Sequence, residues 1–413
     1  MEQKKVWTIL IYANGNNELQ PEMWQSKIAA ESAGFHPDVN VILQVSREKD
    51  ALVGIIRPSY SLPPCNVKWI GARRYLLDNG KSILLKDLGK INMASPKSLY
   101  EFIKWATVYY PADNYMLILS GHGYQFVGAI TDYSQNAPFI MGIPEMCSAI
   151  QSSCEELRLK IELLVFDICY FNSIEVMYEL GKEEVPAVAN VLTYLRNGPI
   201  AGIPLDEFIH TIQANCHSNS RELINQLTQI TSNKNYTLVA TEINHIKLRY
   251  IKELFNNLAS CYLDANSSLN LVELLYYSNP ACFWHSLVSE INSTISSLAI
   301  SYTNNCDSNA RLLFVASAPT SNHNKLALYS KLAFAHNNTW THLLSTKKDY
   351  TPPKTNYSNE LNPTMLTLDE VLTYISIMNP PLPFDQKQVI LEKLINYKKW
   401  GHIQTLQPCS KRP

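Results

Sequence analysis

Short apolar runs rich in Val, Ile and Leu recur along the first half of the chain, and segments of helical periodicity separate them. Unbroken apolar runs of this length are typical of strands that are buried on both faces of a parallel sheet. The pattern therefore predicts buried strands, of which the fifth is weaker and the last is a further candidate, at residues 6–12, 39–45, 115–119, 163–169, 186–192 and 312–316.

Amphipathic helices are predicted between these strands. Residues 95–110 carry apolar side chains at helical spacing, with Ser95 as the expected N-cap and Pro96 at the first helical position. Residues 143–160 show a similar spacing. Because strands alternate with helices, we expect an α/β fold, namely a three-layer αβα sandwich around a mostly parallel sheet.

The pattern becomes mainly helical after about Ser220, and helices are expected at residues 221–231, 245–264, 268–277, 371–378 and 384–400. Thr367 and Glu370 form a predicted capping box, and the Pro-, Asn- and Lys-containing segment 345–364 is expected to be a linker. We therefore expect a first domain, a helix-rich continuation, and a linker with a helical C-terminal appendage, at residues 1–220, 221–345 and 346–413.

Composition and charge exclude several classes of function. Hydrophobic residues make up 46% of the 413 residues and charged residues 17%, which is typical of a globular protein with a large core. The formal net charge of -1 gives no excess of positive charge for nucleic acid or an anionic membrane. No run approaches the ~20 apolar residues of a membrane helix, and the nine cysteines lack C-x-x-C pairs. We therefore expect a cytoplasmic protein in a reducing compartment.

Reactive side chains follow two of the predicted strands. Residues 115–119 run into Ser120-Gly121-His122-Gly123, and the strand at 163–169 ends in Asp167-Ile168-Cys169. Ligands bind at the carboxyl ends of parallel strands, so His122 and Cys169 face one crevice if these strands are neighbours. A thiolate can then attack a carbonyl carbon while an imidazole transfers the proton that the leaving amine needs.

Each residue alone has a simpler interpretation. A single buried Cys usually packs as a small hydrophobic residue, and a His between glycines is usually a turn residue. Their occurrence together at adjacent strand ends favours catalysis. The other eight cysteines are interpreted as structural, and the Cys216-His217 pair is not predicted to bind a metal because no further ligand lies nearby in the sequence.

Four segments, in this order, resemble the clostripain family of cysteine peptidases, which belongs with the caspases: WTILIYANGNNEL, DVNVILQVSRE, YPADNYMLILSGHG and FDICYFNSIEVMYEL. The resemblance extends over residues 6–345. It implies a caspase/hemoglobinase-like fold in which residues 1–220 form the catalytic domain.

The resemblance also implies roles for individual residues. Cys169 would be the nucleophile and His122 the acid/base, with the backbone N–H groups of Gly123 and Cys169 as the oxyanion hole. Asp167 lies where the family binds the side chain that precedes the cleaved bond, which implies cleavage after basic residues, Arg more than Lys. The alternative is that Asp167 only bonds to backbone N–H groups at the strand end.

Asn190 and Asn197 are further residues that the resemblance places at the substrate. The chain departs from the family here, because Ala189-Asn190-Val191 stands where the family typically has Ala-Ser-Glu. No Asp or Glu occurs in residues 185–205, and Arg196 is expected to weaken binding of a cationic side chain.

Two further departures concern access and activation. Tyr124 follows the His122 turn and is expected to narrow the cleft. Residues 123–157, where family members are often cut after a basic residue, contain no Lys or Arg. We therefore expect a peptidase that is active as one chain or is switched on by another route.

Cys-His chemistry needs no cofactor, while the resemblance leaves calcium as a possible ligand, although no acidic EF-hand loop is present. The expected partner is a protein or peptide substrate, and residues 346–413 are candidates for binding a regulatory partner. One alternative function is that of a catalytically silent scaffold or sensor that binds a peptide segment. Another is an acyl transferase or amidase with the same chemistry.

Overall fold

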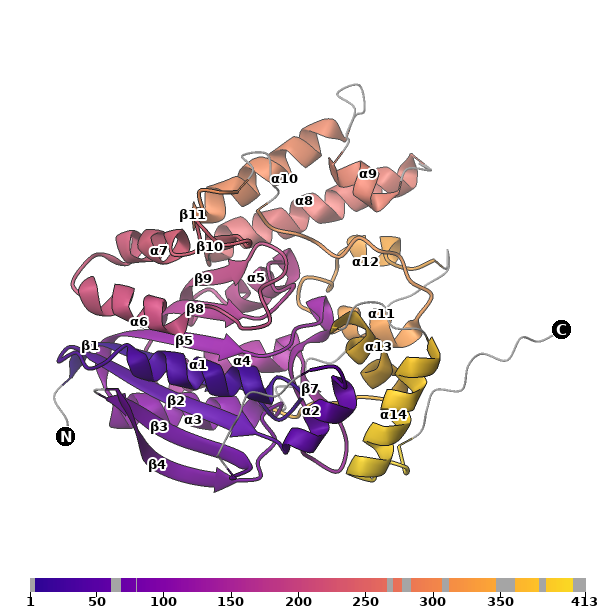
Figure 1. Cartoon of the computed structure of the whole chain (residues 1–413). Helices are drawn as coiled ribbons and strands as arrows, with labels where there is room; N and C mark the ends of the chain where they lie inside the picture. The colour runs from indigo at the N-terminus through magenta and orange to yellow at the C-terminus, as the bar shows by residue number, and fades with distance from the viewer. Residues whose placement is uncertain are drawn as a thin grey trace.

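The computed structural model describes residues 4–60, 68–78, 80–265, 270–276, 284–306, 312–346, 361–378 and 384–403. Within these ranges one large mixed sheet contains, in chain order, β1 (Lys5–Ala13), β2 (Val39–Arg47), β3 (Gly71–Asp78), β4 (Lys81–Gly89), β5 (Ala112–Ser120), β8 (Ile161–Asp167), β9 (Val188–Tyr194), β10 (Leu238–Glu242) and β11 (Ala299–Tyr302). Their spatial order is β11-β10-β9-β8-β5-β1-β2-β3-β4 (Figure 1). A small second sheet consists of β6 (Ala129–Asp132), β7 (Phe139–Met141) and β12 (Thr364–Met365).

The centre of the large sheet is parallel and both of its edges are antiparallel. The five clearest strand predictions correspond to β1, β2, β5, β8 and β9, which pair in parallel. The hairpin of β3 and β4 adds one antiparallel edge, and β10 and β11 add the other. The expectation that residues beyond 220 are mainly helical therefore missed two strands, whose short apolar stretches lie between long helices.

The predicted strand at 312–316 is wrong. Phe314 makes only an isolated bridge to Ser173. Its carbonyl accepts from the N–H of Ile174 at 2.7 Å, and its own N–H donates to the carbonyl of Asn172. These bonds hold the segment across the start of a helix instead of along a strand, so its apolar side chains are buried without a sheet.

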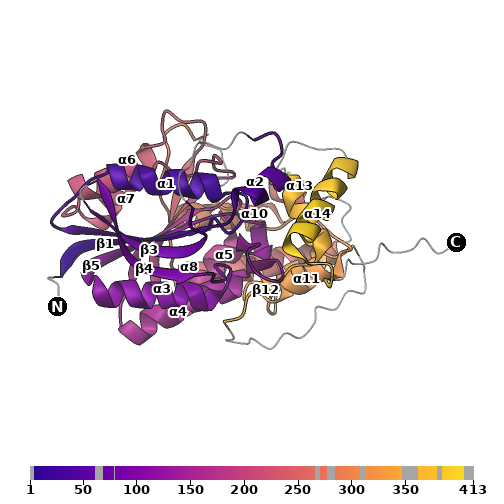
Figure 2. The same cartoon turned by 60° about the horizontal axis from the view of Figure 1, so that its bottom comes forward.

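Helices cover both faces of the sheet, as expected for a three-layer sandwich (Figure 2). One face carries α1 (Gln20–Ser32), α6 (Leu205–Ala214) and α7 (Ser220–Gln229). The other carries α3 (Pro96–Tyr109), α4 (Ile143–Leu157), α5 (Ile174–Gly181) and α8 (His245–Asp264). Alternate side chains of β1 enter the two cores, with Ile9 and Ile11 in one and Leu10 and Tyr12 in the other.

The remaining helical elements are shorter or lie toward the C-terminus: α2 (Asp50–Ile56), η1 (Gln125–Val127), α9 (Leu271–Tyr276), α10 (His285–Leu298), α11 (His323–Ser330), α12 (Trp340–Leu343), α13 (Leu368–Met378) and α14 (Phe384–Lys398). The predicted capping box opens α13, because the Thr367 N–H donates to Glu370 Oε2 at 2.8 Å and the Glu370 N–H donates to Thr367 Oγ1 at 3.2 Å. Most of the linker predicted at 345–364 lies outside the described residues.

The C-terminal helices pack beside the turn that carries His122, close to α2 and β7 (Figure 1). The ring of Tyr374 in α13 stacks on that of Tyr124, with centroids 3.9 Å apart. Trp400, just after α14, is fully buried, and its ring lies edge-on to Tyr133. Tyr124 is therefore buried against the appendage, so the appendage forms part of the wall behind the His122 turn.

Trp400→Ala is expected to lower the free energy of unfolding by about 3–5 kcal/mol, because it empties a large buried site. It also removes the hydrogen bond from Trp400 Nε1 to the carbonyl of Gln135 at 3.1 Å. Urea unfolding measures the change. Val389→Ala in α14 is the matched control, since Val389 is 47% exposed and should change stability by less than about 0.5 kcal/mol. Equal stability of the two variants would show that the appendage does not pack on the domain.

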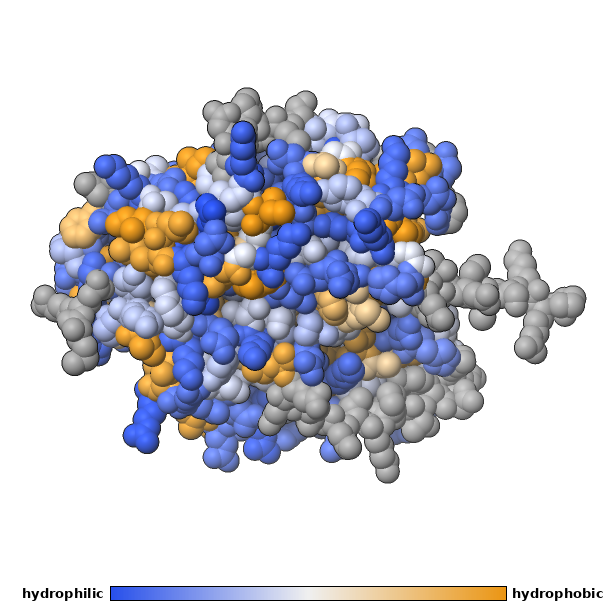
Figure 3. All heavy atoms as spheres, turned by 90° about the horizontal axis from the view of Figure 1, so that it is seen from below, coloured by the Kyte–Doolittle hydropathy of each residue, from blue (hydrophilic) through white to orange (hydrophobic). Residues whose placement is uncertain are grey.

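The molecular surface carries scattered apolar residues. On the face shown in Figure 3, hydrophobic side chains are interspersed with hydrophilic ones and do not gather in one continuous patch. No helix within the described ranges has the length and apolar character needed to cross a bilayer.

Candidate active site

The register of two neighbouring strands brings the predicted reactive residues together. In the parallel pair β5 and β8, Ser120 lies opposite Asp167. His122 and Cys169 each follow two residues later, so both lie beyond the same edge of the sheet. The two turns are also in contact, because a Cβ at Gly123 would collide with the carbonyl oxygen of Cys169. Only glycine permits this close approach.

A cavity of about 200 Å³ lies at this edge. Its lining comes from the first turn of α1, the last residues of β8 and β9, and the loops after β1, β5, β8 and β9. It consists of Leu19, Met23, Gly121, His122, Gly123, Tyr124, Asp167, Cys169, Tyr170, Tyr194, Asn197, Gly198, Pro199, Ile200 and Gly202. Five of the six predicted site residues therefore share one cavity.

Asn190 is the sixth, and its assignment to the substrate is wrong. It lies near the start of β9, opposite Leu163, whereas the cavity lies beyond the other end of these strands. Its Nδ2 donates to the carbonyl of Glu162 at 3.0 Å. The side chain is thus used to join two strands.

Asp167 forms a buried acidic group in the wall of the cavity. Its Oδ1 accepts a hydrogen bond from the Tyr194 hydroxyl at 2.5 Å and one from the Ile203 N–H at 3.0 Å. Burial raises the pKa of this carboxyl, and the hydrogen bonds from Tyr194 and Ile203 oppose the increase. Oδ2 lies only 2.6 Å from where a Cβ of Gly202 would be, and Gly202 has a φ of +76°. Glycine at 202 therefore leaves space beside the second oxygen.

Arg196 does not face Asp167. Its guanidinium lies over the ring of Phe314, 5.5 Å from the ring centre, and Arg196 lines a different cavity. Arg196 was expected to repel a cationic side chain that binds at Asp167. Its position in the structure does not support this expectation, because it lines the other cavity.

The Cys169 thiol is partly exposed and lies near a backbone carbonyl. Sγ lies 3.9 Å from the carbonyl oxygen of Gly198, a weak hydrogen bond. Burial raises the pKa of the thiol above its ordinary value of 9.0, and the charge of Asp167 raises it further. The free protein therefore holds Cys169 mainly as a neutral thiol at pH 7.

Alkylation of Cys169 by iodoacetamide is expected to follow this raised pKa, because only the thiolate reacts. The rate should still be rising at pH 9, and mass spectrometry of the peptide that contains Cys169 measures it. An inflection below pH 7 would contradict the prediction and would show a thiolate–imidazolium pair in the free protein.

Two backbone N–H groups are available as an oxyanion hole. Within the described part of the chain, the N–H groups of Gly123 and Cys169 donate to no carbonyl or side chain. The neighbouring backbone groups are used, since Tyr124 N–H bonds to Gly128 and the N–H of Tyr170 bonds to Arg196. Tyr170 has a φ of +61°, an uncommon conformation that is over-represented at functional sites.

Glu18 is a site residue that the sequence analysis missed. It is 1% exposed, and its Oε1 lies 2.9 Å from His122 Nε2, in an orientation that makes the contact electrostatic rather than a well-aligned hydrogen bond. It follows β1, which pairs with β5 beside Ser120. The sequence did carry a signal for Glu18: it is an acid in the loop after a central strand, and this loop lies at the same edge of the sheet as His122 and Cys169.

The loop that carries Glu18 is held by a buried amide network. Asn14 Nδ2 donates to the carbonyl of Thr131 at 2.6 Å, and Asn16 Nδ2 donates to Asp132 Oδ2 at 2.7 Å. The N–H of Leu19 bonds to Asn17 Oδ1 at 2.9 Å. These bonds fix the carboxylate of Glu18 beside the imidazole.

Glu18→Gln is expected to lower kcat by about 10²-fold, because it removes the carboxylate that lies beside His122 and orients its ring. KM should change little, since Glu18 does not line the cavity. Steady-state kinetics separates the two constants, and Glu18→Asp should recover part of kcat. An unchanged kcat would mean that Glu18 only fills space.

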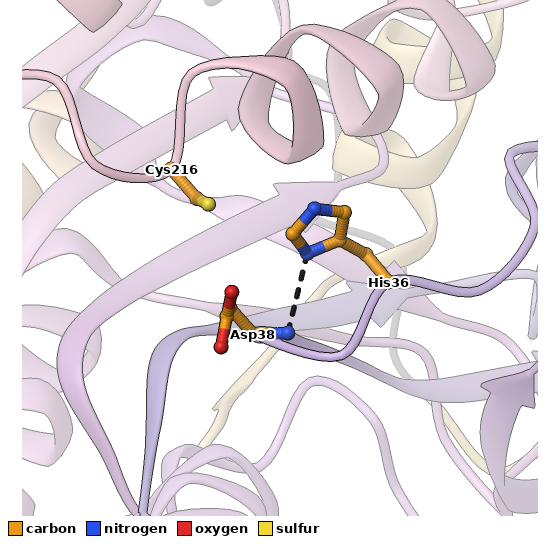
Figure 4. A group of neighbouring side chains, drawn as sticks. All are labelled: His36, Asp38 and Cys216. Atoms are coloured by element: carbon orange, nitrogen blue, oxygen red, sulfur yellow. Dashed lines mark hydrogen bonds between the residues drawn. The ribbon is translucent and has the colours of Figure 1, made fainter.

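A second group of polar residues lies at the opposite edge of the sheet. His36, Asp38 and Cys216 approach one another within 4.8 Å (Figure 4). His36 Nδ1 accepts a hydrogen bond from the N–H of Asp38 at 3.2 Å. Further side chains of the types that bind metals therefore lie close to Cys216 in space, although not in the sequence.

Comparison with known proteins agrees with this geometry. The family model described as the clostripain family matches residues 77–366. An inactive zymogen C11 protease from Parabacteroides distasonis superposes with a TM-score of 0.57 at 14% identity, covering 81% of this chain and 98% of that one. A secreted C11 cysteine protease from Bacteroides thetaiotaomicron, iotapain, gives a TM-score of 0.55 at 14% identity, over 81% and 99%. The search of curated proteins found no match. Because the family model spans most of the chain, the chain belongs to the clostripain family of cysteine peptidases.

Proposed function

We propose that this chain is an endopeptidase that cleaves after basic residues, Arg in preference to Lys, with Cys169 as the nucleophile and His122 as the acid/base. One observation carries the proposal. The register of β5 and β8 places an imidazole, a thiol and a buried carboxylate on a single cavity. Acyl transfer from an amide needs the first two groups, and selection of a cation needs the third.

The chemistry follows from the placement of these groups. The carbonyl oxygen of the substrate accepts hydrogen bonds from the N–H groups of Gly123 and Cys169, and Sγ attacks the carbonyl carbon. The thiol proton passes to His122, which then protonates the amine as the C–N bond breaks, leaving a thioester. A water molecule, deprotonated by His122, hydrolyses the thioester and regenerates the thiol. Because Glu18 occupies Nε2, we assign the proton transfers to Nδ1.

The raised pKa of Cys169 fits this order of events. A neutral thiol in the free protein becomes a nucleophile only when a bound carbonyl lies within reach and His122 accepts its proton. Reactivity is thereby coupled to substrate binding.

The preference for Arg rests on Asp167. The carboxylate is buried at one wall of a small cavity, where a guanidinium can pair with it in a partly desolvated setting. The planar guanidinium can also form two parallel hydrogen bonds, which the ammonium of Lys cannot do.

An electrophilic peptide tests the proposal. A peptidyl chloromethyl ketone with Arg at the reacting position should alkylate Cys169, and mass spectrometry should locate the label on this residue and not on the other cysteines. The Lys analogue should react more slowly, and the Ala analogue slowest. The intact mass of the labelled protein also reports whether it remains one chain. If none of the peptides labels Cys169, the proposal is wrong, and a scaffold that binds peptides without cutting them is favoured.

A further inference from the structure

A second and larger cavity, of about 480 Å³, adjoins the candidate active site. The two cavities share Tyr170 and Asn197 in their linings. Asn197 Nδ2 donates to the Tyr170 hydroxyl at 2.9 Å, so this pair forms the partition between them. A peptide bound at Cys169 therefore passes directly beside the second cavity.

The loops that build the active site also build this cavity. Gln125 and Phe126 follow the His122 turn, residues 170–175 follow Cys169, and residues 195–197 follow β9. Residues 314–320 and α11 close the other side. Its volume lies in the range of about 300–1,000 Å³ that is typical of ligand sites.

Most of the lining is apolar. It includes Phe126, Leu195, Phe314, Val315, Leu326 and Leu344. Such a lining favours binding of a large apolar side chain. An aromatic side chain is favoured in particular, because its ring can pack against the rings of Phe126 and Phe314.

Two buried acceptors in the lining lack partners. Glu175 is 1% exposed, and its Oε1 accepts from the N–H of Ala316 and the hydroxyl of Tyr329, at 2.8 and 3.1 Å. Its Oε2 has no hydrogen bond within the described ranges, and neither has Oδ1 of Asn172, which is 2% exposed. Buried acceptors without donors are rare, so a ligand that brings one donor would satisfy one of the two.

We infer that this cavity is a second substrate subsite, which takes a Tyr or Trp side chain at a position other than that of the basic residue. This inference rests on the proposed peptidase function. The aromatic body fills the apolar lining, and the O–H or N–H at its tip bonds to Glu175 Oε2 or Asn172 Oδ1. A neutral donor fits better than a cation, because Arg196 and Lys325 line the same cavity.

The test measures binding separately from cleavage. Fluorescent peptides with a fixed Arg, and with Tyr, Trp, Phe, Leu, Lys or Ala at each neighbouring position, are titrated into Cys169→Ala protein by fluorescence polarisation. At one position Tyr or Trp should bind at least about tenfold more tightly than Ala, and Tyr about two- to tenfold more tightly than Phe. Equal affinity for all six residues at every position would overturn the inference.

Two variants locate the effect. Ser317→Phe fills the cavity and should abolish the gain from Tyr or Trp, while Ser321→Phe, an exposed position outside the lining, should keep it. Glu175→Gln keeps Oε1 as an acceptor but replaces the unpaired Oε2 with a donor, so it should remove the advantage of Trp, whose N–H can only donate, over Phe. Thermal unfolding confirms that each variant folds.

The outcomes separate the two proposals. If Ser317→Phe keeps the preference for Tyr and Trp, the cavity is not the subsite, whatever the activity. If the wild-type protein neither cleaves nor reacts with the Arg probe, the peptidase proposal fails. A preference that Ser317→Phe then abolishes in the binding assay would still show that the cavity is a peptide site.

Discussion

Cys169→Ala is expected to lower kcat for Arg-containing peptides by on the order of 10⁴-fold or more, because the reaction loses the atom that forms the thioester. The cavity and Asp167 stay in place, so peptide affinity should change by no more than a few-fold. Single-turnover kinetics and fluorescence polarisation measure the two quantities. His122→Ala should cause a loss of similar size, since the nucleophile and the base act as one unit.

Cys261→Ala is the matched control for the nucleophile. Cys261 is a free and partly buried cysteine like Cys169, but it lies in α8 away from the cavity. This variant should retain full activity. Substantial hydrolysis by Cys169→Ala, or equal losses in the two variants, would contradict the assignment of the nucleophile.

Asp167→Asn is expected to lower kcat/KM for Arg peptides by about 10²- to 10³-fold, because a cation would be buried without its counter-charge. Asn is the appropriate replacement, since its carbonyl oxygen can keep the hydrogen bonds from Tyr194 and Ile203. Reaction of Cys169 with a small alkylating agent should persist. Cleavage of a peptide library by both proteins measures the change in preference.

The pH dependence provides a second readout for Asp167. Burial raises the pKa of its carboxyl above 3.8, so on acidification the carboxylate is neutralised at a higher pH than an ordinary Asp. Cleavage after Arg should therefore fall in this range relative to cleavage after neutral residues, and Asp167→Asn should lack this fall. An Arg preference that survives in Asp167→Asn would assign cation binding to another group.

The central strands and the reactive pair were predictable because their signals are local. Apolar runs such as 115–119 and 163–169 are long and unbroken, and parallel strands bring their carboxyl ends to one edge. His122 and Cys169 follow from that geometry alone. The helical spacing of apolar residues also predicted the helices. For α8 the predicted first and last residues are those of the structure.

The missed features depend on contacts between distant segments. Glu18 contacts an imidazole more than one hundred residues away, and only its place in the loop after a central strand pointed to it. Asn190 was assigned by alignment with a motif, whereas its place at the start of β9 depends on strand direction. Tyr124 lines the active-site cavity, as expected, but the stacking of its ring on Tyr374 in the C-terminal appendage could not be predicted from the local sequence. Residues 312–316 have the composition of a strand and lack a partner strand.

The pairing of Ser120 with Asp167 has a consequence for how this fold tolerates change. The main-chain hydrogen bonds between β5 and β8 set how far apart the turns that carry Cys169 and His122 lie. Insertion or deletion of a single residue within β8 would rotate everything downstream to the opposite side of the pleat. We therefore expect β8 to tolerate insertions and deletions less well than substitutions of its apolar residues.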